Sequence, residues 1–210
     1  MSKLSVFLVS TLIAFLGCFS HLAHSQTVLV MGDSLSAAYG IAESAGWVNL
    51  LRQRLTTTHP SSKVVNASIT GDTTQGGLSR LPQALSRHQA DIVIIELGGN
   101  DGLRGLSLHN MRNNLRKMVA LARQAKAKVL LLGVKLPDNY GPVYGEKFHH
   151  VYKDVAASEK VALVDFFLQG VAETRTLMQA DGIHPNAAAQ ARILENVWHG
   201  LKVLQPNFFQ

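Results

Sequence analysis

The chain has 210 residues, of which 47% are hydrophobic and 16% charged, and its formal net charge is +6. This length and apolar fraction predict one domain with one well-covered core, and no repeat or low-complexity run suggests another. Cys18 is the only cysteine, and no basic motif is interleaved with aromatic residues. Disulfide-stabilised folds, cysteine chemistry, the commonest zinc sites and nucleic-acid binding are therefore disfavoured.

The first 25 residues differ in composition from the rest of the chain. Lys3 is their only charged residue, an almost wholly apolar run follows it, and Ala23-His24-Ser25 has small residues where a signal peptidase needs them. We therefore predict a cleaved secretory signal peptide over residues 1–25 and a single domain over residues 26–210. The mature protein, beginning at Gln26, would be periplasmic or secreted.

Two other interpretations of this N-terminus stay open. The apolar run from Leu4 to Phe19 is slightly short for a membrane-spanning helix, which disfavours a retained anchor. Phe15-Leu16-Gly17-Cys18 loosely resembles a lipoprotein processing site, although Phe and Leu suit such a site poorly. The N-terminus of the mature protein distinguishes the three forms.

Short apolar runs alternate with longer segments of helical periodicity along the rest of the chain. The runs typical of strands are Val28–Val30, Lys63–Asn66, Ile92–Leu97, Lys128–Val134 and Val161–Val164. The segments typical of helices centre on Trp47–Leu55, Gly77–Arg87, Ser107–Gln124 and Glu146–Ala157, with a last helix over Ala187–Leu204. Alternating strands and helices imply right-handed crossovers and a parallel sheet covered on both faces. We predict an α/β fold, a three-layer α/β/α sandwich.

The segment between Asp101 and Asp138 is basic, because it contains several arginines and lysines but no acidic residue. Apolar residues recur through it at helical spacing, so most of its cations are expected on the wet face of an amphipathic helix. Weak attraction to an anionic envelope surface is a further expectation. The cations are Arg104, Arg112, Arg116, Lys117, Arg123, Lys126, Lys128 and Lys135.

Polar motifs stand where the first three predicted strands end. These motifs are GDSLS at 32–36, NASITGDT at 66–73 and LGGND at 97–101. A fourth motif, DGIHPN at 181–186, precedes the last helix, and its Pro185 biases His184 away from helical geometry. Ligands of open parallel sheets bind outside the carboxyl ends of the strands, so we expect the four motifs to lie together there.

In this order the motifs resemble the four sequence blocks of the SGNH (GDSL) hydrolases. The blocks are GDSLS, the glycine of NASITGDT, the asparagine of GGND and the DxxH of DGIHPN. The similarity continues through LPQAL, ELGGNDGLRGL and LPDNYGPVYGEKF, and the chain looks like the bacterial multifunctional thioesterase I, lysophospholipase and arylesterase subfamily. The resemblance implies the flavodoxin-like SGNH fold with a five-stranded parallel sheet. Two departures, a lengthened loop at 57–60 and Ala180 before DGIH, bear on substrate range rather than on catalysis.

Ser34, His184 and Asp181 are the residue types that nucleophilic catalysis needs. Ser34 would attack an acyl carbonyl, although a serine here is also a common turn or cap residue. His184 would take the serine proton and pass it to the leaving group, since an imidazole pKa of about 6.5 suits transfer in both directions. Asp181 can reach the far ring nitrogen through a tight loop and fix the tautomer, although Asp-Gly is also an ordinary turn.

Three donors are expected for the negative charge that develops on the carbonyl oxygen. They are the backbone N–H groups of Ser34 and Gly71 and the side-chain amide of Asn100. Asp33 is a poorer candidate for the triad acid than Asp181, because it adjoins the nucleophile, and we expect it to bond within its own turn. We expect Glu96, at the end of an apolar strand, to have hydrogen-bond partners and to support its loop.

The other histidines give no sign of a metal site. His21 and His24 leave with the signal peptide, and His59 lies in a polar loop. The remaining five fall at predicted helix positions, where most would simply be solvated: His88, His109, His149, His150 and His199. Metal-ligand spacing, a phosphate loop and GxGxxG are all missing, so we predict no metal and no cofactor.

The acyl part of a substrate is expected against apolar residues in the loops after the third and fourth strands. These are Leu103, Leu106, Leu136, Pro137, Tyr140 and Tyr144, all of which could instead be simply packed. The resemblance implies thioesters, aryl esters and lysophospholipids as small-molecule substrates, and we expect a monomer. Two alternatives stay open: a carbohydrate-ester deacetylase with the same constellation, and a ligand-binding module that has lost activity.

Overall fold

The computed structural model describes residues 25–210. The predicted signal peptide and both alternatives to it therefore lie outside the described residues, apart from Ser25. Within residues 25–210, no helix is both long enough and apolar enough to cross a bilayer.

A five-stranded parallel sheet forms the centre of the structure. Its strands are β1 (Thr27–Gly32), β2 (Lys63–Asn66), β3 (Ile92–Glu96), β4 (Lys128–Leu132) and β5 (Ala162–Val164). They lie in the order β2-β1-β3-β4-β5, which is the flavodoxin-like order. The predicted fold class and all five strands are confirmed, with small differences in their ends. β1 begins one residue earlier and ends two residues later than predicted, β3 and β4 end one and two residues earlier, and β5 begins one residue later.

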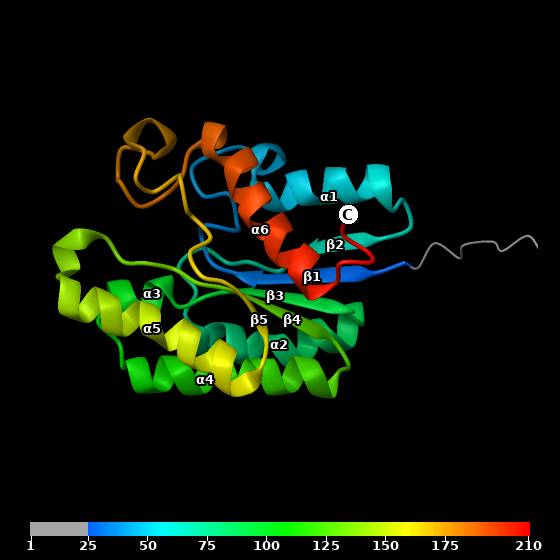
Figure 1. Ribbon diagram of the computed structural model, residues 1–210, viewed down its shortest axis with the longest axis horizontal. Helices are drawn as coiled ribbons and strands as arrows, with labels where there is room; N and C mark the ends of the chain where they lie inside the picture. The colour runs from blue at the N-terminus through cyan, green and yellow to red at the C-terminus, as the bar shows by residue number, and fades with distance from the viewer. Residues whose placement is uncertain (1–24) are drawn as a thin grey trace, which may run out of the picture.

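Helices cover both faces of this sheet (Figure 1). One face carries α1 (Trp47–Thr58) and α6 (Gln190–Leu204), while the other carries α2 (Thr74–His88), α4 (Leu108–Gln124) and α5 (Pro142–Glu159). The last helix was predicted to begin at Ala187, but residues 187–189 form a separate 3-10 turn, capped by the Asn186 side chain. The short helix α3 (Gly99–Leu103) was not predicted, because its two glycines hide any helical pattern.

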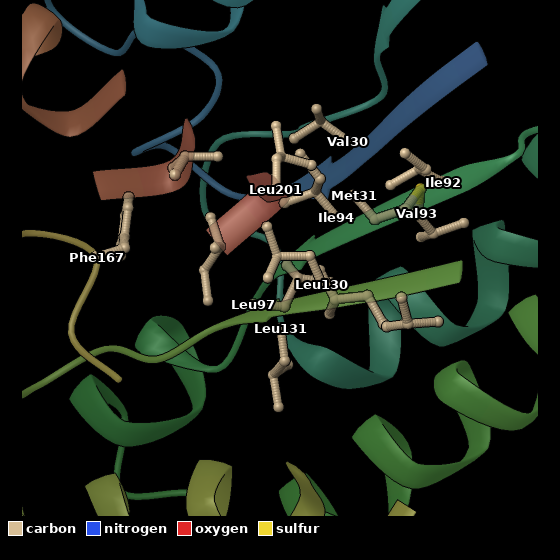
Figure 2. Packing of buried hydrophobic residues seen from close by; sticks show 14 of the residues in the cluster. Val30, Met31, Ile92, Val93, Ile94, Leu97, Leu130, Leu131, Phe167 and Leu201 are labelled. Carbon is tan, nitrogen blue, oxygen red and sulfur yellow. The ribbon is translucent and has the colours of Figure 1, made fainter. Parts of the chain in front are cut away.

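The central strand β3 is buried along its whole length, as the consecutive apolar residues of IVII predict. Its side chains pack between the two helical layers, and each fully buried Ile or Val stabilises the fold by about 1.5–3 kcal/mol. Figure 2 shows this packing around Val93, Ile94, Leu130 and Leu201. The register places Gly32, the last residue of β1, beside Glu96, the last residue of β3. The core therefore fixes where these two strands end.

The basic face of α4 is partly neutralised by α5. Arg112 pairs with Asp154 at 2.7 Å, and Arg116 pairs with Glu159 at 2.6 Å. The arginine side chains remain 39% and 52% exposed, so these are surface ion pairs of modest strength. The expected envelope contact stays a prediction, and it would have to use the cations that α5 leaves unpaired.

Candidate active site

Ser34 lies in a tight turn at the carboxyl end of β1. The Ala37 N–H donates to the Asp33 carbonyl at 2.9 Å, and the Leu35 N–H donates to Asp33 Oδ1 at 3.0 Å. A side chain at Gly32 would meet Ser36 Cβ at 2.7 Å, so the turn can pack this closely only with glycine at its start. The Ser34 hydroxyl lies 2.9 Å from His184 Nε2, although 150 residues separate the two in sequence.

The loop from Met178 to Pro185 delivers His184 to Ser34. Its two ends pair in an antiparallel bridge, and the Gln179 N–H donates to the His184 carbonyl at 2.7 Å. Gly182 turns the chain with φ of +70°, in the left-handed region that favours glycine. The His184 ring also packs against the Tyr39 ring, and the two ring centroids lie 4.5 Å apart.

Asp181 holds the other side of the His184 imidazole. Its Oδ2 lies 2.7 Å from His184 Nδ1, and its Oδ1 accepts the backbone N–H groups of Ile183 and His184 at 2.9 and 3.0 Å. Burial alone would raise the pKa of the Asp181 carboxyl, but these bonds lower it to about 2. An ionised Asp181 places the neutral ring's proton on Nδ1, which leaves Nε2 free to accept the Ser34 proton.

The three expected charge-stabilising donors line the same cleft as Ser34 and His184. Among the described residues, the backbone N–H groups of Ser34 and Gly71 have no hydrogen-bond partner. Gly71 has φ of +79° in a turn closed by the Asp72 N–H and the Ile69 carbonyl at 3.1 Å. Asn100 stands in the first turn of α3. Since unpaired N–H groups beside a nucleophile can bind a developing anion, the arrangement suits acyl transfer.

Asp33 does not face the histidine as Asp181 does. One of its oxygens bonds within its own turn, as expected, but the other accepts the Asn100 side-chain amide at 3.0 Å, a contact that the sequence did not predict. Burial raises the pKa of Asp33 to about 6, against these hydrogen bonds. Its charge therefore carries an energetic cost that the charge on Asp181 does not.

Glu96 accepts hydrogen bonds from the turn that carries Ser34. It is completely buried, and its Oε2 accepts the Ser36 hydroxyl at 2.7 Å and the Asp33 N–H at 3.3 Å. Burial and the neighbouring Asp33 charge raise the pKa of Glu96 well above its usual range, so it is the member of the pair that stays protonated. It makes no contact with the histidine or the cleft in the described residues.

A cleft of about 790 Å³ opens beside Ser34. Of the six residues expected to bind substrate, Leu103, Leu136 and Pro137 line it. The other three do not: Leu106 is 44% exposed, and the hydroxyls of Tyr140 and Tyr144 donate to α3 carbonyls at 3.1 Å. The two tyrosines therefore brace α3 from the side.

Several cleft residues escaped the sequence analysis. They come from the ends of β4 and β5 and from the His184 loop: Val134, Phe166, Leu168, Met178 and Ile183. Position after a strand would have indicated Val134 and Phe166. No local pattern marks Met178 or Ile183, whose loop reaches the cleft only because the bridge at Met178 and Pro185 folds it back.

Two histidines have partners that the sequence did not indicate. His149 is buried, and its Nδ1 lies 2.9 Å from the Val134 carbonyl. The His59 ring stacks on Phe208 with centroids 4.0 Å apart. Within residues 25–210, no group of three or more metal-ligating side chains could hold an ion.

Comparison with known proteins gives a consistent set of relatives. Residues 30–192 match the family described as GDSL-like Lipase/Acylhydrolase. The chain is 57% identical to "Esterase TesA" of Pseudomonas aeruginosa over 182 residues, which cover 87% of this chain and 90% of the relative. It is 44% identical to "Thioesterase 1/protease 1/lysophospholipase L1" of Escherichia coli over 184 residues, 88% of this chain and 86% of the relative.

A solved structure agrees with these relatives. The psychrotrophic esterase EstA from Pseudoalteromonas sp., in a structure inhibited by monoethylphosphonate, matches with a TM-score of 0.82 and 37% identity. The match covers 87% of this chain and all of that one. Sequence and structure therefore point to the same group of proteins.

Proposed function

Because this chain belongs to the GDSL-like lipase/acylhydrolase family and is a serine hydrolase of the esterase and thioesterase class, we propose that Ser34, His184 and Asp181 are its catalytic triad. The observation that carries the proposal is one unbroken relay. Asp181 Oδ2 lies 2.7 Å from His184 Nδ1, and His184 Nε2 lies 2.9 Å from the Ser34 hydroxyl, at the mouth of the cleft.

The relay supports a two-step hydrolysis. Ser34 Oγ attacks the carbonyl carbon of the ester while its proton passes to His184 Nε2, and Asp181 stabilises the resulting imidazolium. The negative carbonyl oxygen is bound by the N–H groups of Ser34 and Gly71 and by Asn100 Nδ2. As the tetrahedral intermediate collapses, the alcohol or thiol leaves with the proton from His184. Water, deprotonated by His184, then attacks the acyl-enzyme, releases the acid and restores Ser34.

The composition of the cleft favours an acyl chain as the bound part of the substrate. Leu103, Leu136, Phe166 and Leu168 present apolar side chains along it, and burying a methylene group contributes about 0.8 kcal/mol. We therefore propose aryl esters, acyl thioesters and lysophospholipids as substrates, in keeping with the relatives' names. A carbohydrate-ester deacetylase would need a more polar cleft, and an inactive binding module would not need the complete relay.

A series of p-nitrophenyl esters of increasing chain length tests the proposal. We expect kcat/KM to rise from acetate to medium-chain esters, to vanish in Ser34→Ala, and to be unaffected by EDTA. Hydrolysis of acetate alone would establish the deacetylase. Binding without turnover would establish the inactive module, and loss of activity in EDTA would contradict the metal-independent mechanism.

We also propose that the protein is exported and acts as a monomer in the periplasm or outside the cell. The charge-poor apolar N-terminus and Ala23-His24-Ser25 support cleavage before Gln26. The intact mass of the protein recovered from its native host checks this. A diacylated Cys18 would establish a lipoprotein, and an uncleaved Met1 would establish an anchor.

A further inference from the structure

The side-chain amide of Asn100 is held at both ends. Its nitrogen donates to Asp33 Oδ2 at 3.0 Å, and its oxygen accepts a longer bond from Arg104 Nη2 at 3.5 Å. Rotating the amide by 180° would place its oxygen against a carboxylate, which only accepts hydrogen bonds, and its nitrogen against a guanidinium, which only donates them. The two contacts therefore decide which end of Asn100 can face a substrate.

The same Arg104 nitrogen also reaches the loop that carries Gly71. Arg104 Nη2 donates to the Gly71 carbonyl at 2.8 Å, so one guanidinium joins the loop after β2 to the helix after β3. Gly71 lacks a side chain and has φ of +79°, and glycine loses more conformational freedom on ordering than any other residue. A bond from outside the loop restricts the rotation of this peptide.

Arg104 differs in this from Arg112 and Arg116 of α4. Arg112 and Arg116 are also partly exposed, but each pairs with a carboxylate of α5. Within the described residues, the guanidinium of Arg104 donates to two neutral oxygens, both on residues expected to bind the oxyanion.

We propose that Arg104 is a positioning residue that holds the Gly71 and Asn100 donors in one arrangement. This inference rests on the proposed function, in which Gly71 and Asn100 bind the oxyanion. Donors that are fixed before the reaction stabilise the transition state without a cost of reorganisation. Removal of Arg104 therefore lowers kcat and leaves KM nearly unchanged, because the donors act chiefly in the transition state.

The test uses the neutral substrate p-nitrophenyl butyrate, which offers Arg104 no anion to bind. Arg104→Met removes the guanidinium and keeps an unbranched stem, while Arg104→Lys keeps the charge but cannot offer the forked donor. We expect kcat to fall about tenfold in both variants, with KM within about twofold, since displaced catalytic groups lose rate steeply. Lys117→Met, which removes an exposed cation from α4, is the matched control and should retain wild-type kcat.

A double-mutant cycle with Asn100→Ala shows whether Arg104 acts through Asn100. Asn100→Ala alone should lower kcat by about 10²–10³. In that background Arg104→Met should cost less than about threefold, through Gly71 alone, because the amide it orients is gone. Circular dichroism and Tm establish that each variant is folded.

The possible contrary results distinguish a wrong oxyanion hole from a wrong role for Arg104. If folded Asn100→Ala keeps wild-type kcat, the proposed oxyanion hole is wrong. If Asn100→Ala loses activity but Arg104→Met does not, only the positioning role is overturned. Full recovery in Arg104→Lys would show that charge suffices, and a change confined to KM for acyl-CoA would make Arg104 a binding group for anionic substrates. An undiminished Arg104→Met effect in the Asn100→Ala background would overturn the claim that Arg104 orients Asn100, because the whole effect would then pass through the bond to Gly71.

Discussion

The turn that carries Ser34 and the loop that carries His184 each contain an aspartate, and the two carboxyl groups have opposite surroundings. Asp33 is 2% exposed, and burial raises its pKa to about 6. The Asp181 side chain is 40% exposed, and although burial acts to raise its pKa, hydrogen bonds from His184 and Ile183 lower it to about 2. One region penalises negative charge, and the other stabilises it.

This difference indicates that the His184 loop contributes mainly to activity and the Ser34 turn mainly to stability. In the proposed mechanism Asp181 stabilises an imidazolium, which requires an ionised carboxylate, and a pKa of about 2 keeps Asp181 ionised near neutral pH. The Ser34 turn instead gains its rigidity from buried hydrogen bonds through Asp33, Ser36 and Glu96. Substitutions in the His184 loop should therefore cost activity, whereas substitutions beneath Ser34 should cost stability.

The largest expected effect is that of Asp181→Asn. We expect kcat to fall by about 10⁴, because a neutral amide can neither stabilise the imidazolium nor enforce the Nδ1–H tautomer. Tm should fall only modestly. The lowered pKa means that folding stabilises the Asp181 charge, but the side chain is 40% exposed, and asparagine can still accept the backbone N–H groups of Ile183 and His184. Steady-state kinetics and thermal melts measure both.

Asp138→Asn is the matched control for this variant, because Asp138 also lines the cleft but belongs to another loop. It should keep wild-type kcat. A large loss of Tm in Asp181→Asn, or a small loss of kcat, would remove the distinction between the two regions.

Ser36→Ala should show the opposite pattern. It deletes the 2.7 Å bond from the Ser36 hydroxyl to Glu96 in a site that excludes water, so the free energy of unfolding should fall by about 1–3 kcal/mol. The drop in kcat should be far smaller than in Asp181→Asn. Ser79→Ala, which removes an exposed helix hydroxyl, serves as the control and should stay within about 0.5 kcal/mol of wild type. Denaturant melts measure the free energy of unfolding of both variants. Unchanged stability in Ser36→Ala would contradict the support role of Glu96.

The remaining expected effect is on the pH dependence of stability, and it involves no change in kcat. Asp33 binds its proton with a pKa of about 6 in the folded protein and 3.8 in the unfolded chain, so the folded state holds more protons between these values. Its contribution therefore makes the free energy of unfolding fall as pH rises from about 4 to 6, by at most about 1.4 kcal/mol per pH unit. Asp33→Asn should flatten this part of the profile. An identical slope in both proteins would show that Asp33 is not desolvated.

The sequence predicted the sheet and the meeting of the four motifs at one cleft for a common physical reason. Consecutive apolar residues such as those of β3 can satisfy their burial only in the middle of a covered sheet. The ends of parallel strands meet at one edge, so GDSLS and GGND had to lie near each other. The predicted roles of the individual residues remain proposals until they are measured.

The contacts between loops could not be predicted in the same way. The Asn100–Asp33 and Arg104–Gly71 bonds join different loops, and no periodicity encodes which side chains will meet there. Tyr140 and Tyr144 were expected in the cleft because they are apolar loop residues, but their hydroxyls needed acceptors and found them on α3. Hydrogen-bond satisfaction, rather than hydrophobicity, decided their positions.

Covalent labelling tests whether the Asp181–His184 relay makes Ser34 the nucleophile. The folded wild-type protein is treated with a fluorophosphonate, and the modified peptide is identified by mass spectrometry. We expect one adduct, on Ser34, which is absent in Ser34→Ala and forms much more slowly in Asp181→Asn. An adduct on another residue, labelling that persists in Ser34→Ala, or an unchanged rate in Asp181→Asn would contradict it.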